Sequence, residues 1–259
     1  MPDVIADVLE QAARTPDACA LIDARGRRIS YAALARRIRE TAGGLRERGL
    51  APGDALLFSI RPGPDALVLA LATVAAGATV VFADPGAGAD LYTARAHRAG
   101  VRFAAAESLL HAAGGTALGR RLARRRGLTL PDLGALTGPA TPPGRVPPHP
   151  RVVHLYSGPW LPGVPRAAVP LRRVTGPPLE DGPDPDAPAV VIFTSGTTGS
   201  PRGVVHTLTT LSAGLGLLRQ RCDLGPGDVV HTDQLMLGLP ALAGGACWSL
   251  PGTPLGPAR

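Results

Sequence analysis

A ten-residue polar stretch at 194–203 combines the residue types that hold the phosphates of a nucleotide. It contains five hydroxyl side chains, three glycines and one cation: Thr194, Ser195, Gly196, Thr197, Thr198, Gly199, Ser200, Arg202 and Gly203. ATP carries a flexible polyanion, so a protein that holds it needs glycines for close backbone approach, N–H groups that point inward, hydroxyl donors and a cation. The composition of this stretch therefore predicts an ATP phosphate-binding loop.

Three different kinds of loop match this stretch less well. An ordinary polar turn also uses Gly, Ser and Thr, but such connections are usually two to six residues long. A Walker A loop requires a lysine, and all 27 basic residues of this chain are arginines. A serine hydrolase would place glycine two residues before its nucleophile, whereas Phe193 stands there before Ser195. Arg202 keeps its charge and can contact two phosphate oxygens at once, so it should preserve phosphate binding in place of lysine.

The elements that must position the loop follow an alternating pattern. An apolar run at 189–193 predicts a strand before the loop, and 208–218 predicts a helix after it. Further upstream, Ser30 can cap a helix with apolar residues at spacings of three and four, and the runs 55–60 and 101–105 have strand length. Strands that are apolar on both faces and separated by helices indicate an α/β fold, with a parallel sheet covered by helices on both faces.

The uncharged run at 66–83 is 18 residues long, which is the threshold for suspecting a membrane span. Gly77 stands where a helix would end, β-branched residues follow it, and Asp84 begins a turn with Pro85. The run therefore predicts a buried helix followed by a buried strand, and no membrane span is expected.

Proline content divides the chain into three parts. Residues 131–188 hold 16 of the 28 prolines and are expected to form a connecting region with short strands at 151–157 and 171–174. Residues 1–130 are expected to form a first α/β subdomain. Residues 189–259 are expected to begin a second one, whose strands at 189–193 and 228–231 would form an incomplete sheet that is less stable than the first subdomain.

Charge and cysteine content limit the possible partners and sites. The formal net charge is +7, with the densest cluster at Arg120, Arg121, Arg124, Arg125 and Arg126. Because no aromatic residues alternate with these arginines, we expect a solvated helix face and no nucleic-acid partner. Cys19, Cys222 and Cys247 lack the spacing of a zinc site, which favours reduced thiols, and the acidic start lacks a secretion signal. A cytoplasmic protein is expected.

The loop resembles the phosphate-loop signature of the adenylate-forming superfamily, which includes acyl-CoA synthetases, luciferases and peptide-synthetase adenylation domains. Lysine usually stands at the position of Arg202. Residues 29–34 with 49–54 resemble the opening helix of that family, and 75–85 resemble its second signature. The stretches 84–88 and 193–196 are most similar to fatty-acid ligases and the related β-lactone synthetases. The resemblance covers nearly the whole chain and implies the first subdomain plus an incomplete second sheet of the family's N-terminal domain.

This resemblance implies an ATP-dependent reaction in which a carboxylate becomes an acyl-adenylate, with Mg²⁺ in the complete enzyme and a thiol such as CoA as the usual acceptor. His206 lies near the position where relatives commonly place a histidine, so it is a candidate substrate contact, with a structural role as the alternative. The family's later signature, Tyr-Gly-x-Thr-Glu, needs a tyrosine and a glutamate after the loop, but the last tyrosine here is Tyr156 and the last glutamate is Glu180. The family's catalytic lysine has no counterpart either.

No catalytic residue or metal ligand is therefore predicted within the chain. We expect the N-terminal part of an AMP-forming carboxylic acid ligase, of the fatty-acid type, that is inactive alone and is complemented by a C-terminal half. The alternative is a non-catalytic remnant or nucleotide-binding module.

Overall fold

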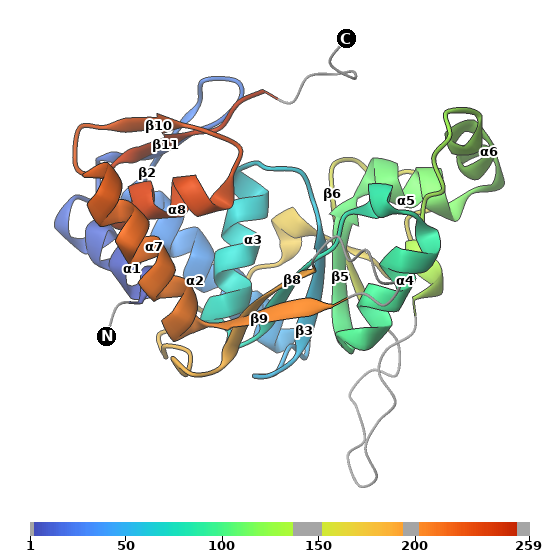
Figure 1. Ribbon diagram of the computed structural model, residues 1–259, viewed down its shortest axis with the longest axis horizontal. Coiled ribbons are helices and arrows are strands. Elements are labelled where there is room, and N and C mark those ends of the chain that lie inside the picture. The colour runs from blue at the N-terminus through green and yellow to red at the C-terminus, as the bar shows by residue number, and fades with distance from the viewer. Residues whose placement is uncertain (1–2, 137–151, 194–201, 253–259) are drawn as a thin grey trace, which may run out of the picture.

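The computed structural model describes residues 3–136, 152–193 and 202–252, and the strands among them form two sheets (Figure 1). The helices are α1 Val4–Arg14, α2 Tyr31–Glu47, α3 Pro64–Ala75, α4 Ala89–Arg98, α5 Ser108–Gly115, α6 Ala117–Arg125, α7 Leu208–Cys222 and α8 Leu235–Ala243, with the short 3-10 helices η1 Pro85–Ala87, η2 Leu133–Ala135 and η3 Leu171–Arg173. The strands are β1 Cys19–Ile22, β2 Arg28–Ser30, β3 Ala55–Ser59, β4 Thr79–Phe82, β5 Val101–Glu107, β6 Val153–Ser157, β7 Val169–Pro170, β8 Pro188–Phe193, β9 Gly203–Thr207, β10 Val229–His231 and β11 Cys247–Ser249.

The larger sheet has seven strands in the order β7-β6-β5-β3-β4-β8-β9. Each neighbouring pair is parallel except β8 and β9, which form an antiparallel edge. One face packs with α3 in the larger apolar cluster, through residues such as Leu67, and the other packs with α4 in the smaller cluster, through Tyr92 and Ala96. Helices cover both apolar faces of the strands, and the predicted parallel α/β sheet is therefore confirmed.

The uncharged run at 66–83 folds as predicted, with most of α3 followed by β4. Residues 66–74 of α3 are buried, Gly77 adopts a φ of +73° where the helix ends, and β4 pairs with β3 in parallel. Within the described residues, no helix combines the length and the apolar character needed to cross a bilayer.

The smaller sheet has four strands in the order β10-β11-β1-β2, so it joins the start of the chain to the segment after residue 228. The strands predicted at 189–193 and 228–231 were expected to share one incomplete sheet, and that expectation is wrong. β8 pairs with β4 in the larger sheet, while β10 pairs with β11 in the smaller one. The apolar character of each strand was visible in the sequence, but the identity of its partner depends on packing between distant segments.

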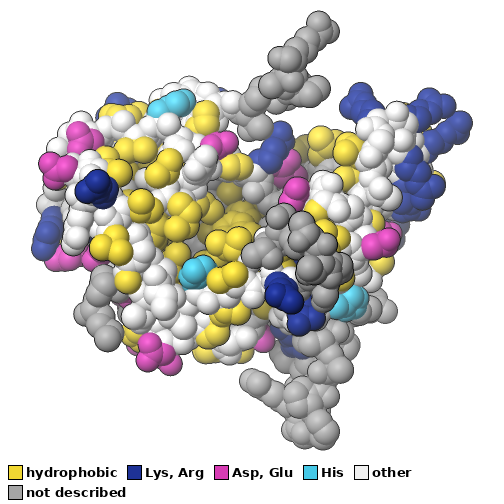
Figure 2. Space-filling model, in the orientation of Figure 1, with side chains coloured by type: hydrophobic (Ala, Val, Ile, Leu, Met, Phe, Trp, Pro, Cys, Tyr) yellow, Lys and Arg dark blue, Asp and Glu magenta, His cyan; other side chains and the backbone are white. Residues whose placement is uncertain are grey.

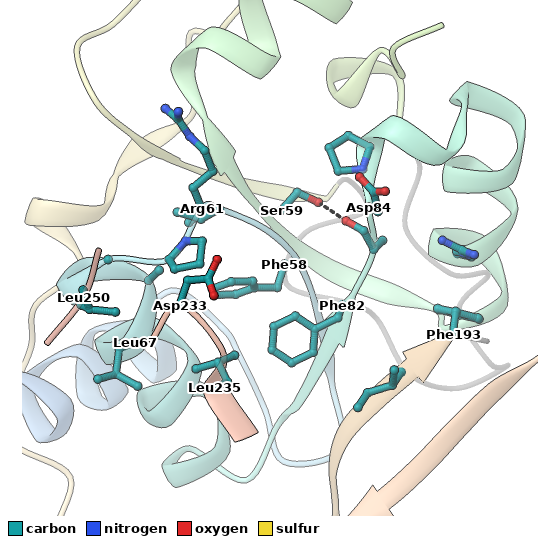
Figure 3. A pocket seen from close by; sticks show the side chains of 18 of the residues that line it. Phe58, Ser59, Arg61, Leu67, Phe82, Asp84, Phe193, Asp233, Leu235 and Leu250 are labelled. Atoms are coloured by element: carbon teal, nitrogen blue, oxygen red, sulfur yellow. Dashed lines mark hydrogen bonds between the residues drawn. The ribbon is translucent and has the colours of Figure 1, made fainter. Parts of the chain in front are cut away.

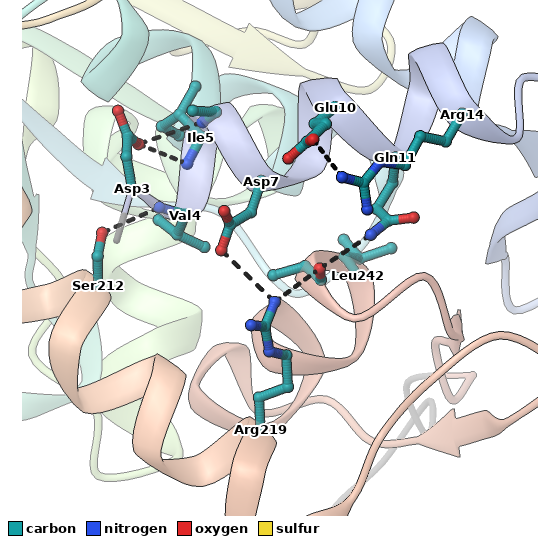
Figure 4. A network of polar contacts seen from close by, with 12 residues as sticks. Asp3, Val4, Ile5, Asp7, Glu10, Gln11, Arg14, Ser212, Arg219 and Leu242 are labelled. Carbon is teal, nitrogen blue, oxygen red and sulfur yellow. Dashed lines mark hydrogen bonds and ion pairs between the residues drawn. The ribbon is translucent and has the colours of Figure 1, made fainter. Parts of the chain in front are cut away.

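Polar contacts also tie α1 to α7 and α8 (Figure 4). Ser212 Oγ accepts a hydrogen bond from the Val4 backbone N–H at 3.0 Å, and Arg219 lies 3.6 Å from the carboxylate of Asp7. Arg219 and Gln11 both donate to the Ala243 carbonyl, at 3.1 and 3.4 Å. The independence of residues 1–130 from residues 189–259 stays a prediction, and these contacts argue against it.

The connecting region differs from the prediction in one short element. β6 confirms the strand expected near 151–157, but 171–174 contains η3 in place of a strand. Pro170 holds its φ at −67° at the start of η3, and the Val174 N–H donates to the Leu171 carbonyl, which closes a tight helical turn. The arginine cluster lies on α6 and just after it, with Arg121, Arg124, Arg125 and Arg126 exposed, as expected for a solvated face.

Candidate functional site

A cavity of about 600 Å³ lies where the neighbouring parallel strands β3, β4 and β8 end (Figure 3). Phe58 and Ser59 of β3, Phe82 of β4, and Ile192 and Phe193 of β8 line it. The carboxyl edge of a parallel sheet is where open α/β folds bind ligands, and this volume lies in the range of small-molecule sites. The cavity is therefore the candidate functional site.

Apolar side chains make most of the cavity wall. The rings of Phe58 and Phe82 meet edge to face with centroids 5.2 Å apart, and Leu67 of α3 also lines the cavity. Leu235 of helix α8 and Trp248 of β11, a strand of the smaller sheet, also line the cavity. Figure 2 shows hydrophobic side chains gathered around a hollow in the middle of this face. Such a surface suits the apolar part of a ligand.

Ser59 lines the cavity with a hydroxyl that is already engaged. Its Oγ donates its single proton to the Ala83 carbonyl at 3.0 Å. Ser59 Oγ therefore accepts the hydrogen bond from the Tyr92 hydroxyl, which lies 2.8 Å away. Burial raises the pKa of Tyr92 well above its usual value, which keeps that hydroxyl protonated as a donor. These bonds join the ends of β3 and β4 to α4, and Ser59 is therefore a structural residue of the rim.

Two cations border the cavity in different environments. Arg61 lies in an ion pair with Glu107, with Nε 2.6 Å from Oε1, and this hydrogen bond raises the pKa of Arg61. Arg95 is buried, and its guanidinium carbon lies 5.3 Å from the ring centroid of Phe193. Among the described residues, Arg95 Nε has no hydrogen-bond partner. Arg95 therefore brings positive charge to the end of β8, where the predicted phosphate loop begins.

Two carboxylates also line the cavity, those of Asp84 and Asp233. Asp84 accepts a hydrogen bond from the Gly86 N–H at 2.8 Å and so shapes the turn that begins η1. Asp233 is exposed between β10 and α8 (Figure 3). The described residues contain no group of three His, Cys, Asp or Glu side chains that could hold a metal ion.

The predicted phosphate loop is only partly within the described residues. Thr194, Ser195, Gly196, Thr197, Thr198 and Gly199 lie outside them. Arg202 is exposed, and Gly203 begins β9 as the direct partner of Phe193. A Cβ at Gly203 would lie 2.9 Å from Val191 Cγ1, so glycine here is required by strand packing. Phe193, which precedes the predicted loop, and Gly203, its last residue, thus lie side by side, and Phe193 lines the cavity.

Strand β9 was not predicted from the sequence. His206 lies on β9 opposite Val190, is half-buried, and is not among the residues that line the cavity. The helix predicted at 208–218 is confirmed as α7, which begins at Leu208 with Thr207 as its cap. Whether His206 contacts a substrate stays a prediction.

Sequence reasoning missed Arg61, Arg95, Asp233 and Trp248 as lining residues. Asp233 carried a usable signal, because it follows a predicted strand and carboxyl ends of parallel strands face ligand sites. Leu235 of α8 also lines the cavity, while residues 238–243 of the same helix are buried.

Comparisons with known proteins agree with this geometry. Residues 8–254 match the family model described as AMP-binding enzyme. The chain is 34% identical to pyochelin synthetase PchE of Pseudomonas aeruginosa over 217 residues, which are 82% of this chain and 12% of that protein. It superposes on apo MbtA of Mycobacterium smegmatis with a TM-score of 0.71 and 24% identity, covering 95% of this chain and 43% of MbtA.

A Rhodopseudomonas palustris protein named as a long-chain-fatty-acid CoA ligase superposes with a TM-score of 0.70 and 16% identity, covering 96% of this chain and 57% of the other. At these identities the two structures show the fold. The chain thus spans about half the length of these structures and about an eighth of the pyochelin synthetase.

Proposed function

Since the chain belongs to the AMP-binding enzyme family, whose members use ATP, we propose that it forms the N-terminal part of a ligase that activates a carboxylic acid as an acyl-adenylate. In this reaction a carboxylate oxygen attacks the α-phosphorus of ATP. The bond from that phosphorus to the pyrophosphate oxygen breaks, and pyrophosphate leaves.

One observation carries the proposal: the strand pair β8–β9 brings Phe193, which precedes the proposed phosphate loop, beside Gly203, its last residue, at the edge of an apolar cavity. Phe193 lines the cavity and pairs directly with Gly203. A loop fixed in this way can hold a triphosphate beside a bound acid, so that the acid's carboxylate and the α-phosphate meet at the cavity mouth. We assign triphosphate binding to Thr194, Ser195, Gly196, Thr197, Thr198, Gly199, Arg202 and Gly203.

Positive charge at this edge supports binding of a polyanion. Arg95 lies under the end of β8, and Arg202 directly precedes β9. Mg²⁺ normally accompanies ATP in such enzymes. The described residues contain no group of three or more His, Cys, Asp or Glu side chains that could hold it.

For the acid, we propose a fatty acid. The Phe58, Phe82 and Leu235 side chains give the cavity an apolar wall that suits an aliphatic chain. The resemblance of residues 84–88 to fatty-acid ligases points the same way. The relative PchE is named a pyochelin synthetase, and the structural neighbour NpsA of Klebsiella oxytoca is named in complex with 3-hydroxybenzoyl-AMSN, so an aromatic acid is the competing substrate class.

We propose that a thiol, of CoA or of a carrier protein, receives the acyl group once a C-terminal half completes the site. The ATP and CoA that such a reaction consumes are cytoplasmic metabolites, which supports a cytoplasmic location.

Tryptophan fluorescence tests the acid class. The chain has two tryptophans: Trp248 lines the cavity, and Trp160 is exposed away from it. In Trp160→Phe, Trp248 is the only reporter, and we expect dodecanoate to change its emission while 3-hydroxybenzoate does not. Leu235→Gln should weaken dodecanoate binding, whereas Leu217→Gln, which alters an exposed leucine of α7, should not. A response to 3-hydroxybenzoate alone would replace the fatty acid with an aryl acid.

Exchange of labelled pyrophosphate into ATP separates catalysis from binding. We expect the chain alone to show no acid-dependent exchange, because the family's magnesium and lysine signatures are absent from it. If neither acid nor ATP binds, the non-catalytic remnant becomes the better interpretation. Robust exchange would support adenylation and refute dependence on a second half.

A further inference from the structure

Two of the three cysteines meet although 228 positions separate them in the chain. Cys19 begins β1, Cys247 begins β11, and these strands are parallel neighbours with Leu21 opposite Trp248. The Sγ atoms of the two cysteines lie 3.3 Å apart. The third, Cys222, ends α7 and is exposed. The sequence suggested three unrelated thiols, whereas the fold makes one pair and one isolated thiol.

The surroundings of the pair do not suit a nucleophile or a metal. Cys247 is buried, and burial, followed by the neighbouring Cys19, raises its pKa to about 12. Catalytic cysteines and thiolate ligands require a lowered pKa. Burial, followed by the neighbouring Cys247 and Cys19, raises the pKa of Tyr31. Its hydroxyl lies within hydrogen-bond distance of the Leu242 and Ala246 carbonyls, at 2.9 and 2.8 Å. Among the described residues, neither cysteine lines the candidate site.

We propose that Cys19 and Cys247 are a redox pair that closes reversibly into an intramolecular disulfide by exchange with a low-molecular-weight disulfide such as oxidised glutathione. Neighbouring strands lie about 4.8 Å apart and rise about 3.3 Å per residue. Residues on adjacent strands in opposite or diagonal positions therefore fall within the Cα separations of about 4.4–6.8 Å that disulfides span.

The exchange takes place in two balanced steps. The partly exposed Cys19 loses its proton and attacks one sulfur of the small disulfide, which releases one small thiol and leaves a mixed disulfide on Cys19. Cys247 then loses its proton and attacks Cys19 Sγ, which releases the second small thiol. Two protein thiols are oxidised and one small disulfide is reduced to two thiols. The raised pKa of Cys247 makes this second step the slow one.

The disulfide would act on the candidate site through β11. Trp248 and Leu250 follow Cys247 closely, and both line the cavity. A covalent link from β1 to β11 would fix this wall and close a loop of most of the chain, so oxidation should raise the melting temperature, by about 5–10 °C for a protein of this size.

The variant Cys222→Ser tests the proposal, because it keeps the pair and removes the exposed thiol. It is incubated in glutathione buffers of increasing oxidised fraction, blocked with an alkylating reagent and analysed by mass spectrometry. We expect both thiols to be lost together, with a mass about 2 Da lower, a cross-linked peptide containing residues 19 and 247, and full reversal by dithiothreitol. The melting temperature should rise with the cross-linked fraction.

Cys19→Ser and Cys247→Ser in the same background should form no intramolecular link and show no rise. The proposal is overturned if Cys222→Ser keeps two free thiols in the most oxidising buffer while the urea-unfolded chain oxidises. Glutathione bound to Cys19 without a cross-link would overturn it equally. Because the main test needs only the exposed Cys222 replaced, it does not depend on the stability of the pair variants.

Discussion

The seven-stranded sheet and the four-stranded sheet are assembled from very different distances along the chain. In the larger sheet, β3 and β4 pair in register across a single helix, and β5 lies on the other side of β3. In the smaller sheet, β1 pairs with β11, so residues 21 and 248 are opposite each other. Closing such a separation costs chain entropy that only well-packed contacts can offset. The smaller sheet should therefore depend more on a few specific contacts.

Those contacts gather around Tyr31 and Trp248, both fully buried. The Tyr31 hydroxyl contacts two carbonyls at the end of α8, and the Trp248 indole donates to the Thr232 carbonyl at 2.8 Å. The larger sheet instead relies on apolar strand faces covered by helices. Trp248 also lines the cavity, so damage to the smaller sheet should alter the site, while the larger sheet provides its base.

Gly238→Ala should have the largest effect, because a Cβ at this position of α8 would overlap the indole ring of Trp248. Neither the ring nor the helix backbone can move freely in the core, so we expect a loss of about 3 kcal/mol in the free energy of unfolding. Urea denaturation measures it. The matched control is Gly214→Ala in α7, where a Cβ meets nothing within 4 Å; it should stabilise by about 0.5–1 kcal/mol. Equal effects at both positions would refute the packing of α8 on β11.

Mild acid should destabilise the larger sheet where β6 packs against α5. His154 of β6 and His111 of α5 are buried with ring centroids 5.8 Å apart, and burial, followed by the charge of His111, lowers the pKa of His154 to about 4. Asp132 acts in the opposite direction. The unfolded chain takes up a proton near pH 6.5 and the folded chain only near pH 4. The free energy of unfolding is therefore not reduced by His154 above about pH 6.5. It falls as the pH drops toward 4, by about 1.4 kcal/mol per pH unit.

Urea denaturation at about pH 7.5, 6.0 and 5.0, on either side of the ordinary histidine pKa, checks this slope. His154→Gln should flatten it, and His97→Gln, which changes an exposed histidine of α4, should leave it unchanged. If the free energy of unfolding of His154→Gln changes with pH as steeply as that of the wild type, another group causes the acid sensitivity.

Two buried tyrosines give a smaller and more direct comparison of the sheets. Tyr31→Phe removes the hydroxyl that contacts the Leu242 and Ala246 carbonyls, and we expect a cost of about 1–2 kcal/mol. Tyr92→Phe removes only a bond to Ser59, whose Oγ still donates to the Ala83 carbonyl, so its cost should be below about 1 kcal/mol. Thermal and urea unfolding of both variants measure the difference. A larger loss for Tyr92→Phe would reverse the comparison.

The sequence allowed prediction of those features that depend on neighbouring residues. The helix and strand within 66–83, the Ser30 cap and helix α7 follow from apolar spacing, capping residues and glycine positions. Strand β9 was missed because Gly203 and His206 have weak strand propensity, and its pairing with β8 supplies the stabilisation. The pairing of β1 with β11 and the roles of Arg95 and Trp248 at the cavity depend on tertiary packing, which no local pattern records.

Residues 194–203 are proposed to hold the phosphates of ATP at the cavity edge, and calorimetric titration of the chain with ATP tests this most directly. The variants are Arg202→Ala and Thr198→Ala, with Arg121→Ala on the exposed face of α6 as the control. Loss of one charge-assisted phosphate contact should cost about 1.5–3 kcal/mol, so Arg202→Ala should weaken binding by about tenfold or more while Arg121→Ala has no effect. Thr198→Ala should weaken it less, because it removes an uncharged donor. ATP affinity that is unchanged in both loop variants would contradict the assignment.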